Sequence, residues 1–143
     1  MKFLRSILGI FFGMVIGVIV IAVLQMINGY LHPMPPGTDP YNPESLRRAF
    51  AGLPATAFVG LLVSYLFGVF FASFAAGKIA GHSEVLHGFV ISLLFALMGI
   101  SNFAMFPAPI WVVILAFIIY FAAGFLGSSF AASLRKTKPA EEL

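Results

Sequence analysis

Long charge-free stretches dominate the pattern of apolar and polar positions along the chain. Residues 6–28 carry no charge and contain an apolar run of 21 residues, 7–27. Residues 49–77 are also uncharged, and Pro54 suits the first turn of a helix there. About 20 apolar residues are needed to cross a hydrocarbon core of about 30 Å. These stretches therefore predict membrane-spanning helices over residues 6–28 and 54–77.

A third uncharged stretch is too long to be one span. Residues 85–134 contain no Asp, Glu, Lys or Arg. As a single helix they would extend about 75 Å at about 1.5 Å per residue, far more than the thickness of a bilayer. The strong helix breakers inside the stretch are Ser101-Asn102 and Pro107-Ala108-Pro109. We therefore expect two further helices, over residues 85–105 and 109–134.

Composition supports this reading and excludes other classes of protein. The chain is 61% apolar and 9% charged, whereas soluble domains are about 45–50% apolar and about 25% charged. A soluble globular domain, a disordered chain and a nucleic-acid binder are thereby excluded, and the absence of Cys excludes disulfides and thiolate metal sites. We predict an all-α, polytopic membrane protein: one domain, residues 1–143, with four transmembrane helices in a compact bundle.

Basic residues predict the orientation of this bundle. Lys2 and Arg5 precede the first helix as in a signal peptide, but its apolar run is longer than a signal peptide's and no small-x-small cleavage motif follows. We interpret it as a retained span. The positive-inside rule then places both termini, the tail 135–143 and the second loop in the cytoplasm. Six basic residues lie on that side, against Arg47 and Arg48 on the other: Lys2, Arg5, Lys78, Arg135, Lys136 and Lys138.

Small residues recur at every fourth position in each predicted span, which allows helix backbones to approach closely. These ridges are Gly9, Gly13 and Gly17; Gly60, Ser64, Gly68, Ala72 and Ala76; Gly88, Ser92 and Ala96; and Gly124, Ser128 and Ala132. They predict a tightly packed bundle. The ridge of the first helix could instead serve a homodimer, and the sequence leaves both readings open.

Local repeats indicate that two helical hairpins arose by duplication. Asn28 and Asn102 are each followed five residues later by a Pro-x-Pro motif. Ser-Phe-Ala-Ala occurs at residues 73–76 and again at 129–132, and Gly-x-Val-Ile begins at both Gly13 and Gly88. Two hairpins of the same orientation would be related by an axis along the membrane normal.

The first outer loop, residues 29–53, contains a predicted short helix. Five prolines make its first half extended and stiff. Asn42-Pro43-Glu44 then reads as an N-cap, a first-turn proline and an acidic first turn, which predicts a helix over residues 43–51. One face is apolar, so we expect the helix to lie at the membrane interface with Arg47 and Arg48 at lipid phosphates. The alternative is a surface for a partner or an anionic ligand, formed by Asp39, Glu44, Arg47 and Arg48. The candidates for interfacial aromatic residues are Tyr30, Tyr41, Trp111 and Tyr120.

Two segments of the chain resemble segments of other membrane proteins. The stretch from His32 to Pro54, with its Pro-Met-Pro-Pro-Gly-Thr-Asp-Pro core, and the stretch from Asn102 to Trp111 resemble a widespread group of uncharacterised bacterial four-helix membrane proteins. The resemblance implies a bacterial cytoplasmic membrane and no known activity. Members of that group commonly have an acidic residue where this chain has Gln25, and often His where it has Ala108.

Polar side chains near the ends of the spans are the candidates for chemistry. On the cytoplasmic side these are Lys78, His82, Glu84 and His87. Glu84 and His87 have the spacing of one arm of a di-iron carboxylate site, but the matching carboxylates on other helices are missing. We interpret the group as capping the third helix among lipid head groups, with a metal site on His82, Glu84 and His87 as the alternative.

At the outer side, Gln25, Asn28 and Asn102 are expected to bond between helices, or to line a vestibule if the duplication holds. The sequence presents no nucleophile–base pair, phosphate loop or paired carboxylates, and the first span lacks the acid on which small multidrug exporters rely. We predict no enzyme and no cofactor. The leading hypothesis is a small accessory or self-associating membrane subunit whose partners are lipids and a second copy or a larger complex. The alternative is a solute or ion channel or carrier that works as a dimer.

Overall fold

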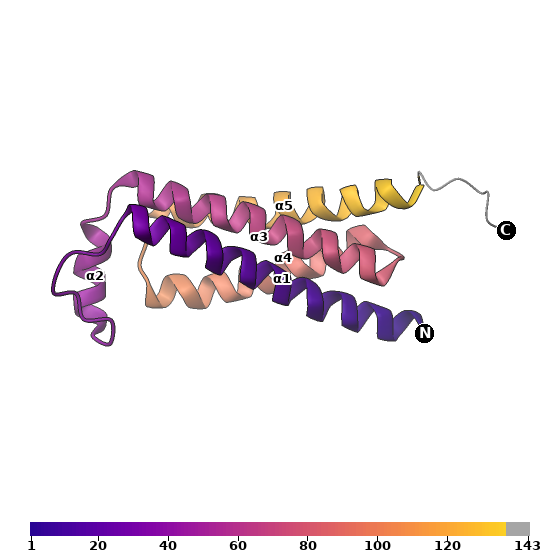
Figure 1. The fold of residues 1–143 in the computed structure, drawn as a ribbon, viewed down its shortest axis with the longest axis horizontal. Coiled ribbons are helices and arrows are strands. Elements are labelled where there is room, and N and C mark those ends of the chain that lie inside the picture. Colours follow the sequence, from indigo (N-terminus) through magenta and orange to yellow (C-terminus); the bar gives the residue numbers. More distant parts are fainter. Residues whose placement is uncertain (137–143) are drawn as a thin grey trace.

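The computed structural model describes residues 1–136 and contains five helices and no strand in that part of the chain (Figure 1). Four are long and apolar enough to cross a membrane. They are α1 (Lys2–Leu31), α3 (Ala55–Ala80), α4 (Glu84–Met105) and α5 (Ile110–Lys136), and the short helix is α2 (Pro43–Ala51). The predicted fold class is confirmed. The first span is longer than expected at both ends and the second continues to Ala80, while Lys138 and the rest of the tail after Lys136 lie outside the described residues.

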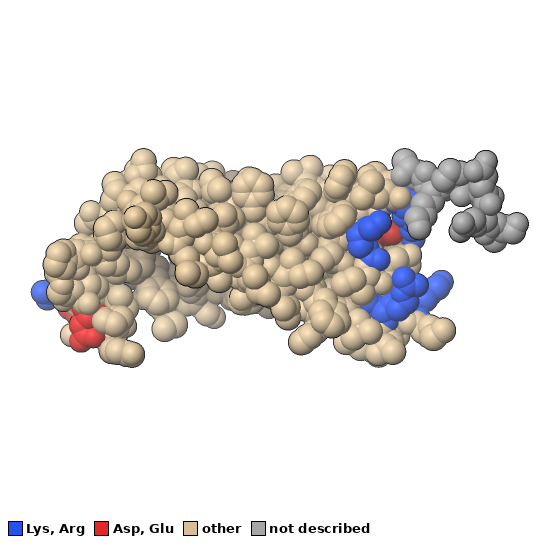
Figure 2. Space-filling view, viewed as in Figure 1, with Lys and Arg blue, Asp and Glu red and all other residues tan. Residues whose placement is uncertain are grey.

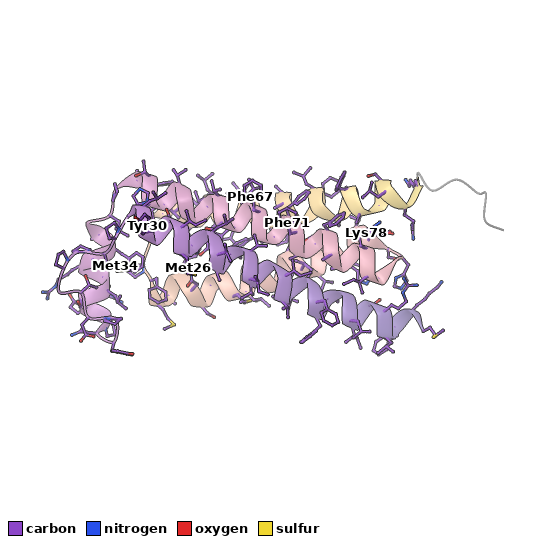
Figure 3. The ribbon with its side chains drawn as sticks, viewed as in Figure 1. Met26, Tyr30, Met34, Phe67, Phe71 and Lys78 are labelled. Atoms are coloured by element: carbon purple, nitrogen blue, oxygen red, sulfur yellow. The ribbon has the colours of Figure 1, made fainter. Side chains whose placement is uncertain are left out.

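The long helices run side by side and α2 lies across one end of the bundle, which we call the α2 end (Figure 1). On the face shown in Figure 2, the charged side chains of the described residues lie at the two ends, and an uncharged belt separates them. Lys2, Arg5, Lys78, Arg135 and Lys136 belong to the end opposite α2, which we call the basic end. Along the belt, apolar side chains such as Phe67 and Phe71 are exposed on the outside of the bundle (Figure 3). The chain is a multi-pass integral membrane protein.

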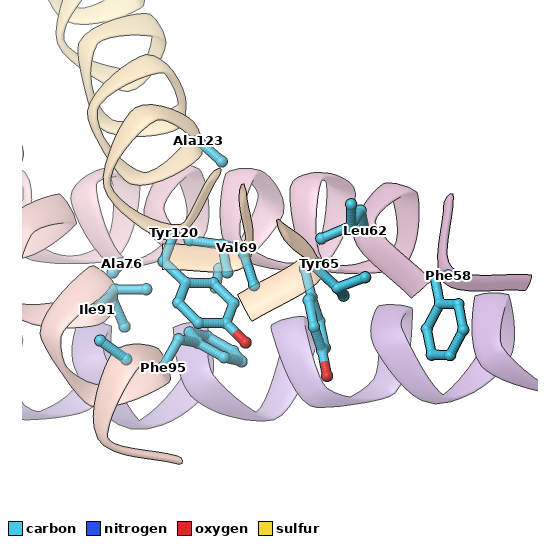
Figure 4. Packing of buried hydrophobic residues seen from close by; sticks show 13 residues of the cluster. Phe58, Leu62, Tyr65, Val69, Ala76, Ile91, Phe95, Tyr120 and Ala123 are labelled. Carbon is cyan, nitrogen blue, oxygen red and sulfur yellow. The ribbon is translucent and has the colours of Figure 1, made fainter. Parts of the chain in front are cut away.

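Helix α3 is the centre of the bundle. It packs against α1, α4 and α5, and α4 also packs against α5, whereas α1 and α4 meet only over a short stretch. The core lies between these helices, with Tyr65 and Val69 of α3 next to Ile91 and Phe95 of α4 and Tyr120 of α5 (Figure 4). Tyr120 is 2% exposed, so its assignment to the interfacial aromatic residues was wrong.

The glycine ridge of α1 holds this helix against α3. Gly9, Gly13 and Gly17 are the buried residues of α1. A Cβ atom at Gly13 would lie 2.6 Å from the carbonyl oxygen of Ala72, and one at Gly9 would lie 2.7 Å from that of Ala76. A distance this short leaves no room for a side chain. The ridge is therefore covered inside the chain, by the ridge of α3.

The two hairpins pack in matching registers, which supports the predicted duplication. Gly13 of α1 lies against Ala72 of α3, and Gly88 of α4 lies against Ser128 of α5. One turn further along, Gly17 lies against Gly68, and Ser92 lies against Gly124. Phe74 and Phe130, at the same place in the repeated tetrapeptide, have ring centroids 5.6 Å apart. The match is incomplete, because α4 packs against α3 whereas α1 makes no comparable contact with α5 in the described part of the chain.

Helix α2 begins as the sequence predicts. The Asn42 side chain accepts hydrogen bonds from the backbone N–H groups of Glu44 (2.9 Å) and Ser45 (3.3 Å), and Pro43 is the first helical residue. Its apolar face packs against protein: Ala49 is buried, and the Phe50 ring lies 5.6 Å from that of Phe106. The helix thus closes the α2 end of the bundle while Arg47 and Arg48 remain exposed.

Candidate binding cleft between α1 and α4

A cleft of about 510 Å³ lies between α1 and α4. The two helices separate from near their middle toward the α2 end (Figure 1). Ala22 of α1 and Met98 of α4 are among the apolar residues of its walls, and Tyr65 of α3 and Tyr120 of α5 also line it. Toward the basic end the cleft is closed, because the Phe95 ring packs directly against Gly17.

Neutral polar groups converge in this cleft. Nδ2 of Asn102 donates a hydrogen bond to the Tyr65 hydroxyl at 2.9 Å. The same hydroxyl interacts with the side chains of Gln25 and Tyr120, and the two tyrosine rings lie 5.3 Å apart. Both phenol hydroxyls point to the same side of the core, toward α1 (Figure 4). This arrangement can donate and accept hydrogen bonds, but it offers no carboxylate, imidazole or amine for proton transfer.

Two smaller cavities adjoin the cleft on the side of the α2 end. One, of about 200 Å³, is lined by Gln25, Asn102 and Phe50, among others. The other, of about 260 Å³, is lined by Gln25, Asn28 and residues of the outer loop. Gln25 lines all three spaces, which follow one another from the middle of the bundle to the α2 end.

The structure separates Asn28 from Asn102, although the sequence pairs them in the repeat. Asn28 donates to the carbonyl oxygen of Ala57 at 2.9 Å, which ties α1 to the start of α3, and its Oδ1 lies 3.1 Å from Nδ1 of His32. Asn102 instead bonds to Tyr65, and the two asparagines line different cavities. Gln25, rather than either asparagine, lines all three spaces.

At the basic end, Glu84 and two arginines hold the turn between α3 and α4. Glu84 is buried, and its Oε1 lies 3.1 Å from Nε of Arg135. Nη1 of Arg135 donates to the carbonyl oxygen of Gly81 at 2.8 Å, and Nε of Arg5 donates to that of Ile79 at 3.3 Å. The last carbonyls of a helix lack intrahelical partners, so arginines from α1 and α5 satisfy the C-terminal end of α3.

The other polar candidates of this end do not join Glu84 in one site. The His82 and His87 rings lie 5.3 Å apart, and Nδ1 of His87 lies 2.9 Å from the carbonyl oxygen of Ser83. Lys78 is exposed near this end of α3 (Figure 3). Within residues 1–136, no group of three His, Cys, Asp or Glu side chains could hold a metal ion. Glu84 is directed to Arg135 and not to the two histidines.

Two of the four outer-loop candidates, Glu44 and Arg48, line a separate pocket of about 350 Å³, whereas Asp39 and Arg47 do not line it. Glu44 and Arg48 form an exposed ion pair at 3.8 Å. Asp39 accepts a hydrogen bond from the backbone N–H of Tyr41 at 2.9 Å, so it supports the turn before α2. Exposed pairs of this kind contribute at most about 1 kcal/mol.

The packing candidates of α3 all lie at helix contacts. Gly60 receives the Asn28 side chain, Gly68 lies against Ile21, and Ser64 is fully buried and donates to the carbonyl oxygen of Gly60 at 2.8 Å. The sequence analysis missed Tyr65 as a functional candidate. A tyrosine in the middle of an uncharged span was the available signal, because its hydroxyl needs a partner where there is no water.

Comparisons with known proteins add no family to this picture. No protein-family model matches the chain, and neither a curated protein nor a solved structure matches it. The cleft is therefore interpreted from its own residues.

Proposed function

We propose that this protein is a non-catalytic subunit of a bacterial cytoplasmic membrane assembly, formed with a second copy or with another membrane protein. The observation that carries the proposal is that the ionisable groups at the basic end form structural contacts. Glu84 is neutralised by Arg135, and His87 is bonded to the backbone of its own helix. These contacts engage both groups in holding the turn between α3 and α4, which supports a structural role for them.

In this proposal the surface that contacts the partner lies at the α2 end. The glycine ridge of α1 is already covered by α3, which argues against association through that ridge. Helix α2 presents Arg47 and the ion pair of Arg48 with Glu44 on an exposed face, held in place by Phe50. The distribution of basic residues supports an orientation with the α2 end outside and both termini in the cytoplasm. The resemblance to bacterial four-helix membrane proteins supports the same location.

Native mass spectrometry of the protein, extracted gently from its own membrane, tests this role. We expect a second copy or a second polypeptide in fixed stoichiometry. We also expect it to be lost in a variant with Arg47→Glu and Arg48→Glu, while Arg47→Lys with Arg48→Lys retains it. A lone chain, or a complex that is indifferent to the charge reversal, contradicts the proposal.

A carrier that works as a dimer is the second candidate, and the cavities that share Gln25 favour it. They follow one another from the α2 end to the middle of the bundle, and each has Gln25 and mainly apolar residues in its lining. Toward the basic end, however, Gly9 and Gly13 bring α1 into backbone contact with α3, and Phe95 closes the cleft against Gly17. Vesicles loaded with pH-sensitive or potassium-sensitive dyes test this candidate. Selective flux that disappears in Gln25→Leu would favour the carrier over the subunit role, and flux equal to that of empty vesicles would reject it.

A further inference from the structure

We propose that the cleft between α1 and α4 binds a neutral amphiphile, a molecule with an uncharged hydrogen-bonding head group and an apolar tail. The head group would lie at Gln25, Tyr65 and Asn102, and the tail would follow the apolar walls at Ala22 and Met98. The proposal does not depend on the subunit role, because the cleft lies within the bundle, whereas the proposed partner surface lies on α2.

The size of the cleft fits a small molecule. Its volume of about 510 Å³ lies within the range of about 300–1,000 Å³ that is usual for ligand pockets. A helix of a second copy is the competing occupant, and crosslinks between two copies through the cleft would reveal it.

The lining of the cleft selects an uncharged head group. No Asp, Glu, Lys, Arg or His belongs to its lining within the described residues. A charge placed there would lose its hydration and find no opposite charge, which is costly in a medium of low dielectric constant. Neutral hydroxyl, ester or ketone groups meet no such cost.

The polar groups in turn select against a plain hydrocarbon chain. Tyr65 lies ten residues into α3, about 15 Å along the helix axis from its start. An asparagine side chain has two donor hydrogens and two acceptor lone pairs, and the bond from Asn102 to Tyr65 uses one of them. Lipid tails offer no hydrogen-bonding group to complete the set. A head group that bonds to Asn102 and Gln25 would satisfy them.

Photocrosslinking in phosphatidylcholine nanodiscs tests the proposal with two matched probes. One is a monoacylglycerol with a diazirine in its acyl chain, and the other is its phosphate, a lysophosphatidic acid with the same chain. We expect the neutral probe to label residues 18–25 and 98–105 at least fivefold more than the charged one. Mass spectrometry of the digested protein locates the labels.

Two matched pairs of variants make the test specific to the cleft. Ala22 is exposed within the cleft, so Ala22→Phe fills it, whereas Ala122→Phe places the same ring on an exposed position of α5 that does not line it. We expect the first variant to lose the labelling and the second to keep it. Tyr65→Phe removes one hydroxyl and should reduce the preference for the neutral probe, while Tyr30→Phe, at an exposed tyrosine near the end of α1, should not.

Competition identifies the source of the neutral head group. Displacement of the probe by unlabelled monoacylglycerol indicates a glyceride, and displacement by a long-chain isoprenoid alcohol indicates an isoprenoid; either result supports the site. Equal labelling by both probes, labelling that survives Ala22→Phe, or crosslinks between two copies through the cleft would overturn it. If Ala22→Phe does not fold, the comparison of Tyr65→Phe with Tyr30→Phe decides, because an unchanged preference in Tyr65→Phe rejects the proposal.

Discussion

Nε of Arg135 lies 3.1 Å from Oε1 of Glu84, and the Glu84 side chain is only 5% exposed. This pair joins the last turn of α5 to the first turn of α4, and Arg135 continues to the carbonyl oxygen of Gly81. One arginine thus connects α5, α4 and the end of α3. The contact makes Arg135 a structural residue as well as one that sets the orientation of the chain.

Removing Arg135 should destabilise the protein. Removing one partner of a buried pair costs about 3–5 kcal/mol, and the half-exposed arginine lowers our expectation for Arg135→Ala to about 1–3 kcal/mol. The free energy of unfolding in mixed micelles, measured by titration with SDS, checks this value. Arg48→Ala breaks an exposed pair and serves as the control, with an expected loss below about 0.5 kcal/mol. Equal losses in the two variants would show that Glu84 is not held by Arg135.

A methyl group at Gly13 should separate α1 from α3. Its Cβ would lie 2.6 Å from the backbone oxygen of Ala72, which cannot move aside as a flexible side chain can. We expect Gly13→Ala to cost about 1–3 kcal/mol of stability. Gly29 lies on the same helix with nothing within 4 Å of its Cβ position, so Gly29→Ala should be neutral or gain up to about 1 kcal/mol from helix propensity. The same titration measures both, and a tolerated Gly13→Ala would refute the close contact.

The absence of Cys permits a direct test of orientation. Tyr41, in the outer loop, is 93% exposed, and Lys136 is exposed at the opposite end. A membrane-impermeant maleimide should label Tyr41→Cys in intact cells and Lys136→Cys only after permeabilisation. Val69→Cys, at a fully buried position, should remain unlabelled in both conditions. The reverse pattern for the first two variants would invert the proposed topology.

Tyr65 and Asn102 should be energetically coupled across α3 and α4. Hydrogen bonds between membrane helices contribute about 0.6 kcal/mol on average and at most about 1.7 kcal/mol. A double-mutant cycle of Tyr65→Phe with Asn102→Ala should give a coupling energy in this range. Asn28 bonds to the backbone of Ala57 instead, so Tyr65→Phe with Asn28→Ala should be additive. Additivity in both cycles would mean that the Tyr65–Asn102 bond does not form in the membrane.

The sequence by itself determined the elements that depend on local chemistry. The spans follow from apolar runs bounded by charge, because a helix must satisfy its own backbone hydrogen bonds to cross a bilayer. Helix α2 follows from Asn42 and Pro43, because a cap and a first-turn proline act within a few residues of their own position. The ridge of Gly9, Gly13 and Gly17 was also visible as a surface for close packing.

Only the tertiary structure decided which surfaces meet. The spans are apolar on the sides that face lipid as well as on those that face the core, so they lack the amphipathic period that marks the buried face of a soluble helix. The sequence therefore suggested Tyr120 as an interfacial residue, although it lies in the core beside Tyr65. The pairing of Glu84 with Arg135, and the cleft between α1 and α4, likewise depend on the rotation and order of the helices. Those are set by contacts between residues far apart in the chain.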